Sequence, residues 1–194
     1  DGGSVASPRT LGGFTYVLDG GGTSYITSAA GYGLTVPAGN TLVLNADAAG
    51  GVYNFELRSS SLADNFRLLS LALESFGGTA SSTFTIRGYD GGSMTAALVS
   101  ENVDLNASDA TGSVTYTKSG AVIGGTLAFG AAWANVDTIV FSATNGDGLY
   151  MAVDAIDVGA ADAVAPTASI TLGDTALKVS DFALVTITFS EPVT

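Results

Sequence analysis

Carboxylates are the side chains in this sequence that are best suited to chemistry. The chain has 18 Asp and Glu residues, of which only four are Glu, and many of the aspartates stand beside Gly or Asn. Short carboxylates in glycine-rich turns suit the oxygen coordination that calcium prefers. Asp-Gly and Asn-Gly pairs also form ordinary hairpin turns, so each aspartate has a purely conformational alternative.

Asp137 and Asp154 are the first two candidate calcium ligands. Each lies on an expected strand, 136–143 or 149–158, in phase with the apolar residues two and four positions further along. If those strand faces point inward, both carboxylates reach the edge of a core, where an unpaired charge is costly. Backbone N–H groups at a strand end could serve as partners. A calcium ion could do so too, and it would offset the repulsion between two acids.

Asp19 is the third candidate ligand, because it ends an expected strand directly before three glycines. Asp90 and Asp147, each followed by Gly, form an alternative pair. The predicted metal set is therefore Asp19, Asp137 and Asp154, and the expected ion is Ca²⁺.

Aromatic and polar side chains at expected loop positions form the candidate ligand-binding set. Sugar binding usually combines an aromatic face with carboxylate or amide hydrogen bonds. Tyr32 and Tyr89 can offer ring faces, and Asp90 and Asn145 can offer hydrogen bonds if their loops share one rim. Trp133, the only tryptophan, is either a stacking platform for a sugar ring or a cap on the core.

The residue types needed for common catalytic machinery are missing. The chain has no His and no Cys, which excludes Ser-His-Asp and Cys-His catalysis, the usual zinc ligands and disulfide bonds. None of the four Glu lies in a recognisable acid–base motif of the kind that glycosidases need. The glycine clusters lack the following Lys-Ser/Thr and helix of a phosphate-binding loop. We therefore expect no enzyme.

The charge balance limits the partners. With six basic residues and a formal net charge of −12, the surface is poorly suited to nucleic acid or to an anionic membrane. No uninterrupted apolar run reaches the roughly 18 residues of a membrane-spanning helix, so we expect no direct membrane insertion. Divalent cations suit such a chain better.

The elements that must position these residues show a period of two, which is typical of half-buried strands. The segment 62–76 is ambiguous between helix and strand, and we prefer strand because its flanks are rich in Ser and Gly. Many short strands separated by turns indicate a sandwich or barrel. The expected strands are 14–18, 41–44, 52–58, 66–73, 82–89, 94–103, 113–117, 136–143 and 149–158.

A domain boundary is expected near 159–166, where GAADAVAP reads as a short linker. About thirty residues follow it, and they cannot bury a core alone. Either the sequence is cut inside a second domain, which we favour, or the segment packs on the first. The predicted domains are 1–160 and 161–194.

Two stretches resemble known families. The segment 165–193, APTASITLGDTALKVSDFALVTITFSEPV, resembles the start of the bacterial Ig-like repeats of giant surface proteins. This resemblance implies neighbouring Ig-like repeats in the same chain, outside the cell.

The rest of the chain more loosely resembles jelly-roll, lectin-like modules related to the galactose-binding fold. The blocks are NFRLLSLAL, FTIRGYDGG, WANVDTIVFSA and YMAVDAIDVG, in that order. The resemblance implies an all-β jelly-roll sandwich, sugar or other surface ligands, and a structural calcium ion. Asp-Ala-Ile-Asp at 154–157 departs from the commonest closing pattern of these modules.

The leading hypothesis is a monomeric, non-catalytic module that binds a surface glycan or peptide, belongs to a secreted or cell-surface bacterial adhesin and uses calcium. The alternatives are a structural spacer of a giant repeat protein and an accessory carbohydrate-binding module of a secreted polysaccharide-degrading enzyme. The lack of an internal repeat within 1–160 argues mildly against the spacer.

Overall fold

The chain divides into two compact units, residues 1–162 and 163–194, and each is described here by itself. The structure is a computed structural model. It describes residues 4–5, 9–11, 13–19, 23–37, 40–46, 54–61, 64–76, 82–110, 112–143, 149–161, 167–173, 176, 178–179 and 182–190.

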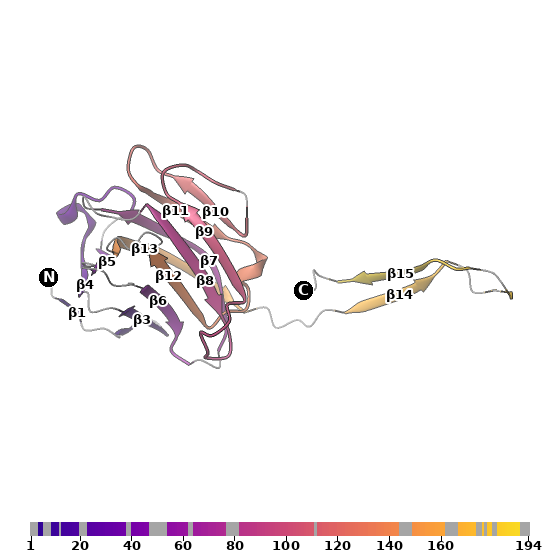
Figure 1. Ribbon diagram of the computed structural model, residues 1–194. Helices are drawn as coiled ribbons and strands as arrows, with labels where there is room; N and C mark the ends of the chain where they lie inside the picture. The colour runs from indigo at the N-terminus through magenta and orange to yellow at the C-terminus, as the bar shows by residue number, and fades with distance from the viewer. Residues whose placement is uncertain are drawn as a thin grey trace. The chain divides into compact units, whose positions relative to one another are not determined.

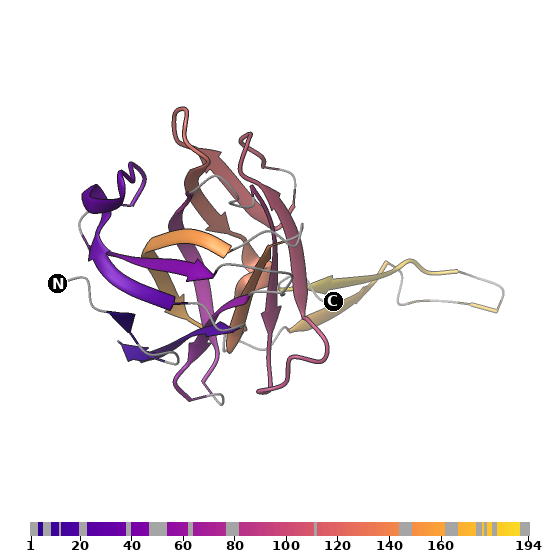
Figure 2. The same ribbon diagram turned by 60° about the vertical axis from the view of Figure 1, so that its left-hand side comes forward.

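Two antiparallel sheets form the first unit, and they lie face to face (Figures 1 and 2). The seven-stranded sheet consists, in spatial order, of β1 (Ser4–Val5), β4 (Thr23–Ser28), β5 (Asn40–Ala46), β13 (Leu149–Ala160), β7 (Phe66–Ser75), β11 (Gly124–Phe129) and β10 (Val114–Lys118). The six-stranded sheet consists of β2 (Arg9–Leu11), β3 (Phe14–Asp19), β6 (Asn54–Ser59), β12 (Thr138–Ala143), β8 (Thr83–Tyr89) and β9 (Val99–Asp104).

The chain crosses between the two sheets repeatedly. Strands β5 to β8 alternate between the sheets, β8 pairs with β9 in one sheet, and β11 to β13 alternate again. The helical elements among the described residues are two single 3₁₀ turns, η1 (Ala29–Tyr32) and η2 (Ala131–Trp133). The prediction of an all-β sandwich is confirmed. Within the part of the chain that the structure describes, no helix is long and apolar enough to cross a membrane.

The core lies between the two sheets and is built from alternate strand residues. On β8, for example, Phe84 and Ile86 face the core, while Thr85 and Arg87 face outward. Such alternation gives a sheet one apolar and one polar face. The largest fully buried side chains are Trp133, Tyr116, Phe55, Phe84, Phe141, Leu44, Leu57, Leu68, Leu71, Leu73, Ile86 and Leu105.

One predicted strand begins later than expected, and four observed strands were not expected. The expected strand 94–103 begins only at Val99, because Val99 is the first residue that pairs with β8, opposite Gly88. Strands β1, β2, β4 and β11 were not predicted. In β11 the pair Gly124-Gly125 resembles a turn, yet both glycines lie in the ladder with β7. The ambiguous segment 62–76 contains strand β7, not a helix.

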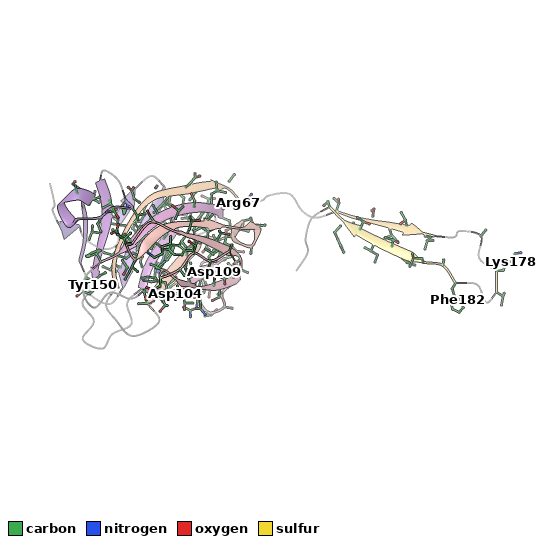
Figure 3. All side chains as sticks on the ribbon, turned by 90° about the horizontal axis from the view of Figure 1, so that it is seen from above. Arg67, Asp104, Asp109, Tyr150, Lys178 and Phe182 are labelled. Atoms are coloured by element: carbon green, nitrogen blue, oxygen red, sulfur yellow. The ribbon has the colours of Figure 1, made fainter. Side chains whose placement is uncertain are left out.

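The second unit contains one antiparallel hairpin, β14 (Ala168–Leu172) and β15 (Val185–Phe189). Ile170 pairs with Ile187 and Leu172 with Val185, so apolar side chains share one face of the ribbon. All four are at least half exposed to solvent. Phe182, in the connection between the two strands, is 97% exposed (Figure 3).

Candidate functional site

Asp137 lies at one end of the sandwich, where it joins three strands of the six-stranded sheet. It directly precedes β12, and its backbone N–H donates to the carbonyl oxygen of Tyr89, the last residue of β8 (2.9 Å). Its own carbonyl oxygen accepts from the backbone N–H of Ser59, the last residue of β6 (2.8 Å). The backbone of Asp137 is therefore fixed on both sides, and its side chain is held in one place.

The carboxylate of Asp137 is completely buried and only half satisfied. Oδ2 accepts a hydrogen bond from the backbone N–H of Gly92 (2.6 Å), whereas Oδ1 has no hydrogen-bond partner among the described residues. Gly91 and Gly92 both have positive φ (77° and 69°), which lets the chain after β8 turn back onto the carboxylate. A buried carboxylate oxygen without a donor is unfavourable, and a bound cation would satisfy it.

A continuous exposed loop follows β8. Every residue from Asp90 to Leu98 is exposed to solvent, including two large apolar side chains, Met94 (45%) and Leu98 (61%). Of the predicted ligand residues at this position, Asp90 is exposed, but Tyr89 is buried at 8% exposure. The loop therefore offers Asp90 and its apolar side chains to a partner, and it offers little of the Tyr89 ring.

Trp133 belongs to the core, and the prediction of a stacking platform is therefore corrected. Its side chain has no exposed surface, and its ring meets that of Phe129 edge to face (centroids 5.1 Å apart). Its Nε1–H donates to Ser113 Oγ (3.0 Å), and that hydroxyl donates to Glu101 Oε2 (2.9 Å). The alternative, a tryptophan that caps the core with a satisfied indole N–H, describes what the structure shows.

The strand-phase argument for Asp154 is wrong, because a β-bulge changes the phase of β13. The pairing of β13 with β7 shifts between Asp154 and Asp157, and Ala155 there has a positive φ of 49°. Ile156 and Val158 consequently pack against the core, whereas Asp154 lies on the other face. Its Oδ1 accepts a hydrogen bond from the backbone N–H of Ala155 (2.7 Å), as expected for a side chain that stabilises a bulge.

The predicted metal set is not assembled among the described residues. Asp137 precedes a strand of the six-stranded sheet, whereas Asp154 lies on the seven-stranded sheet. The described part of the chain contains no group of three or more acidic side chains that could hold a metal ion. Asp19 ends β3 and Tyr32 ends η1, but their side chains lie outside the described structure. Asn145 and Asp147 also lie outside the described residues.

Other buried carboxylates have structural partners. Glu74 is 5% exposed, and its Oε2 accepts from the backbone N–H groups of Thr35 (2.7 Å) and Val36 (2.8 Å). Glu56 forms an ion pair with Arg58 on the same strand. These contacts fix a loop and a strand face.

Two tyrosines of the sandwich have raised pKa values. Burial raises the pKa of Tyr116 to about 12, and repulsion from Asp104 (Figure 3) adds to the rise. The Tyr116 hydroxyl donates to the carbonyl oxygen of Leu105 (3.2 Å). Burial also raises the pKa of Tyr16. Both phenols therefore stay protonated at neutral pH.

Sequence reasoning missed a row of polar side chains on the outer face of the six-stranded sheet. Asn102, Thr85, Ser142 and Asn54 are cross-strand neighbours on β9, β8, β12 and β6, and we call them the polar row. The signal was present in each strand separately, as the residues that alternate with Phe84, Phe55 and Phe141. The strand order that aligns them cannot be read from the sequence.

Comparison with known proteins gives one family and one structural likeness. Residues 162–194 match the bacterial Ig-like domain family. No curated protein matches the chain. Among solved structures, the chain is similar to the cleaved adhesin domain of Lys-gingipain from Porphyromonas gingivalis, with 14% sequence identity, 78% of this chain and 92% of that chain covered, and a TM-score of 0.41. Because the TM-score is this low, we draw no conclusion about residues 1–162 from this likeness.

Proposed function

We propose that residues 1–162 form a non-catalytic module that binds a glycan or peptide in a secreted or cell-surface bacterial adhesin, with calcium assisting. The bacterial Ig-like match at 162–194 supports a place in a surface protein. The resemblance to jelly-roll, lectin-like modules supports a binding role.

The observation that carries this proposal is the loop 90–98 together with its anchor. Nine consecutive exposed residues follow a central strand, and Gly92 within them is tied to the buried Asp137. An exposed loop on a rigid sandwich is the usual arrangement of a binding site. The exposed Met94 and Leu98 side chains add apolar contact area.

A binding screen tests the proposal. The full chain, in millimolar calcium, is applied to glycan and peptide arrays beside the double variant Met94→Ala/Leu98→Ala. We expect wild-type binding that the double variant weakens by about tenfold or more, at an unchanged melting temperature, because both side chains are exposed. The absence of wild-type binding from both arrays at high protein concentration would contradict the proposal and favour the spacer.

The end of the sandwich that carries Asp137 offers an oxygen ligand of the kind that calcium binds. Asp137 Oδ1 is buried and lacks a partner among the described residues, and a hard cation is the ligand that such an oxygen accepts. Asp90 and the backbone carbonyls of the loop 90–98 offer further oxygen donors, because this loop contains Gly92, which contacts Asp137. The bound ion would supply positive charge that holds the loop against the sandwich.

Replacing Asp137 with Asn should change the melting temperature in opposite directions with and without calcium. In calcium, we expect the wild type to melt several degrees above Asp137→Asn, because the ion binds only the folded state. In chelator, we expect Asp137→Asn to be at least as stable, because Asn can still accept from Gly92 N–H and carries no half-satisfied buried charge. Scanning calorimetry in both buffers measures the difference.

Asp157→Asn is the matched control, since it makes the same charge change at an exposed position of β13. It should leave the calcium response of the melting temperature intact. An identical wild-type melt in calcium and in chelator, with Asp137→Asn more stable in both, would remove calcium from the proposal.

A further inference from the structure

The outer face of the six-stranded sheet carries an organised set of hydrogen-bond donors. In the polar row, Ser142 Oγ donates to Asn54 Oδ1 (2.7 Å) and Thr85 Oγ1 donates to Asn102 Oδ1 (2.7 Å). Arg87 Nη1 donates to Ser142 Oγ (3.5 Å), which directs the Ser142 proton toward Asn54. Both amide oxygens are therefore occupied, and both amide NH₂ groups lack an acceptor among the described residues.

Arg87 adds an unpaired positive charge to this face. Its side chain is half-buried on β8, and the described part of the chain gives it no carboxylate within ion-pairing distance, because the ion pair there joins Arg58 to Glu56. The chain has only six basic residues at a net charge of −12. A guanidinium held without a counter-ion on so acidic a protein is suited to an anion from outside, and carboxylates match its planar fork.

Solvent reaches some side chains of this face more than others. Thr85 is almost covered (9% exposed), whereas Asn54, Ser142 and Arg87 are half-buried and Asn102 is exposed. Asn102 and Asn54 lie three strand intervals apart, which is about 14 Å at the usual strand spacing. That span suits an extended ligand better than a single small anion.

The position of the polar row within the sheet distinguishes between classes of polymer. β6, β12 and β8 are interior strands, so their backbone groups are used in the ladders. Extended peptides are usually captured by backbone pairing at a free strand edge. Of the four strands of the polar row, β9, which carries Asn102, is an edge strand. A peptide paired along it would run parallel to the strands and would not cross the row to Asn54. A saccharide needs only side-chain donors for its hydroxyl and carboxylate oxygens.

We propose that Arg87, Asn54 and Asn102 form a binding site for an oligosaccharide that carries carboxylate groups. Arg87 holds a carboxylate, and the two amide NH₂ groups donate to oxygens on either side of it. This site is separate from the loop 90–98 and does not depend on the role proposed for that loop.

Titration calorimetry with an oligogalacturonate hexamer tests the site on the full chain. The wild type should bind the hexamer. The same oligosaccharide with its carboxyl groups reduced to alcohols should bind at least tenfold more weakly. Arg87→Gln should weaken binding by about tenfold, and Asn102→Ala by a smaller factor. Asn102 is exposed, so that variant should fold, and its melting temperature should fall only slightly because it loses the hydrogen bond from Thr85.

Arg67→Gln provides the matched control. Arg67 is an exposed arginine on β7 in the other sheet (Figure 3), so the variant changes the net charge equally and should bind within about twofold of the wild type. Equal losses in Arg67→Gln and Arg87→Gln would overturn the site in favour of diffuse electrostatics. Absence of wild-type binding at millimolar hexamer, or equally tight binding of a hexaglutamate peptide, would overturn the saccharide assignment.

Discussion

Replacing Trp133 with Ala should lower the free energy of unfolding by about 3–5 kcal/mol, the usual cost of removing a buried aromatic ring. Trp133 is the largest fully buried side chain. Its ring packs on Phe129, and its Nε1–H satisfies Ser113 Oγ. The Ala variant leaves a cavity between η2 and β11 and removes a donor from that hydroxyl.

Urea denaturation followed by circular dichroism measures this loss, because the variant lacks the only tryptophan fluorophore. Trp133→Phe should cost less, since it keeps most of the ring contact and loses only the indole hydrogen bond. Leu98→Ala serves as the surface control and should stay within about 0.5 kcal/mol of the wild type. A loss below about 1 kcal/mol in Trp133→Ala would contradict the buried placement of the ring.

Replacing Gly125 with Ala should destabilise the sandwich by about 3 kcal/mol or more, at or above the upper range for overpacked sites. A Cβ at Gly125 would overlap the carbonyl oxygen of Thr117 and lie 2.9 Å from the Tyr116 ring. Backbone cannot rotate away as a flexible side chain can, so β10 and β11 would have to separate. Thermal unfolding of the variant checks the size of the loss.

Gly31→Ala is the matched control for this prediction. A Cβ at Gly31 meets no atom within 4 Å, and its φ is not positive, so the variant should melt close to the wild type or slightly above it. Equal melting temperatures for the two variants would show that β10 and β11 do not approach each other as closely as described.

The local features of the fold could be predicted from the sequence. The alternation in 82–89 predicts β8 because a strand with one buried face must repeat every two residues. Features that depend on a distant partner could not be predicted. Gly124 and Gly125 resemble a turn until the neighbouring backbones of β7 and β10 are known. The apolar residues Met94 and Leu98 resemble a strand, but no strand pairs with them.

The residues of the candidate site also include some that the sequence could predict and some that it could not. Asp137 is buried, as its phase with the core residues Ile139 and Phe141 predicts, but all residues from Val136 to Phe141 are buried, so the phase alone does not explain it. For Asp154 the same argument failed, because one extra residue at the bulge reverses the phase and leaves no signature in composition. The burial of Trp133 depends on packing between elements, and the alignment of the polar row depends on the strand order. Neither is known until both sheets are assembled.

The position of β13 has a consequence for mechanical load. This twelve-residue strand ends the first unit and is paired on both sides, with β5 and with β7. Tension along β13 would load both ladders in shear over Met151–Val153, where the strand is paired on both sides, and the ladder with β7 alone from Asp157 to Ala160. A terminal strand at a sheet edge would instead unzip one bond at a time. The paired strand that ends the first unit is therefore suited to resist tension along its own axis.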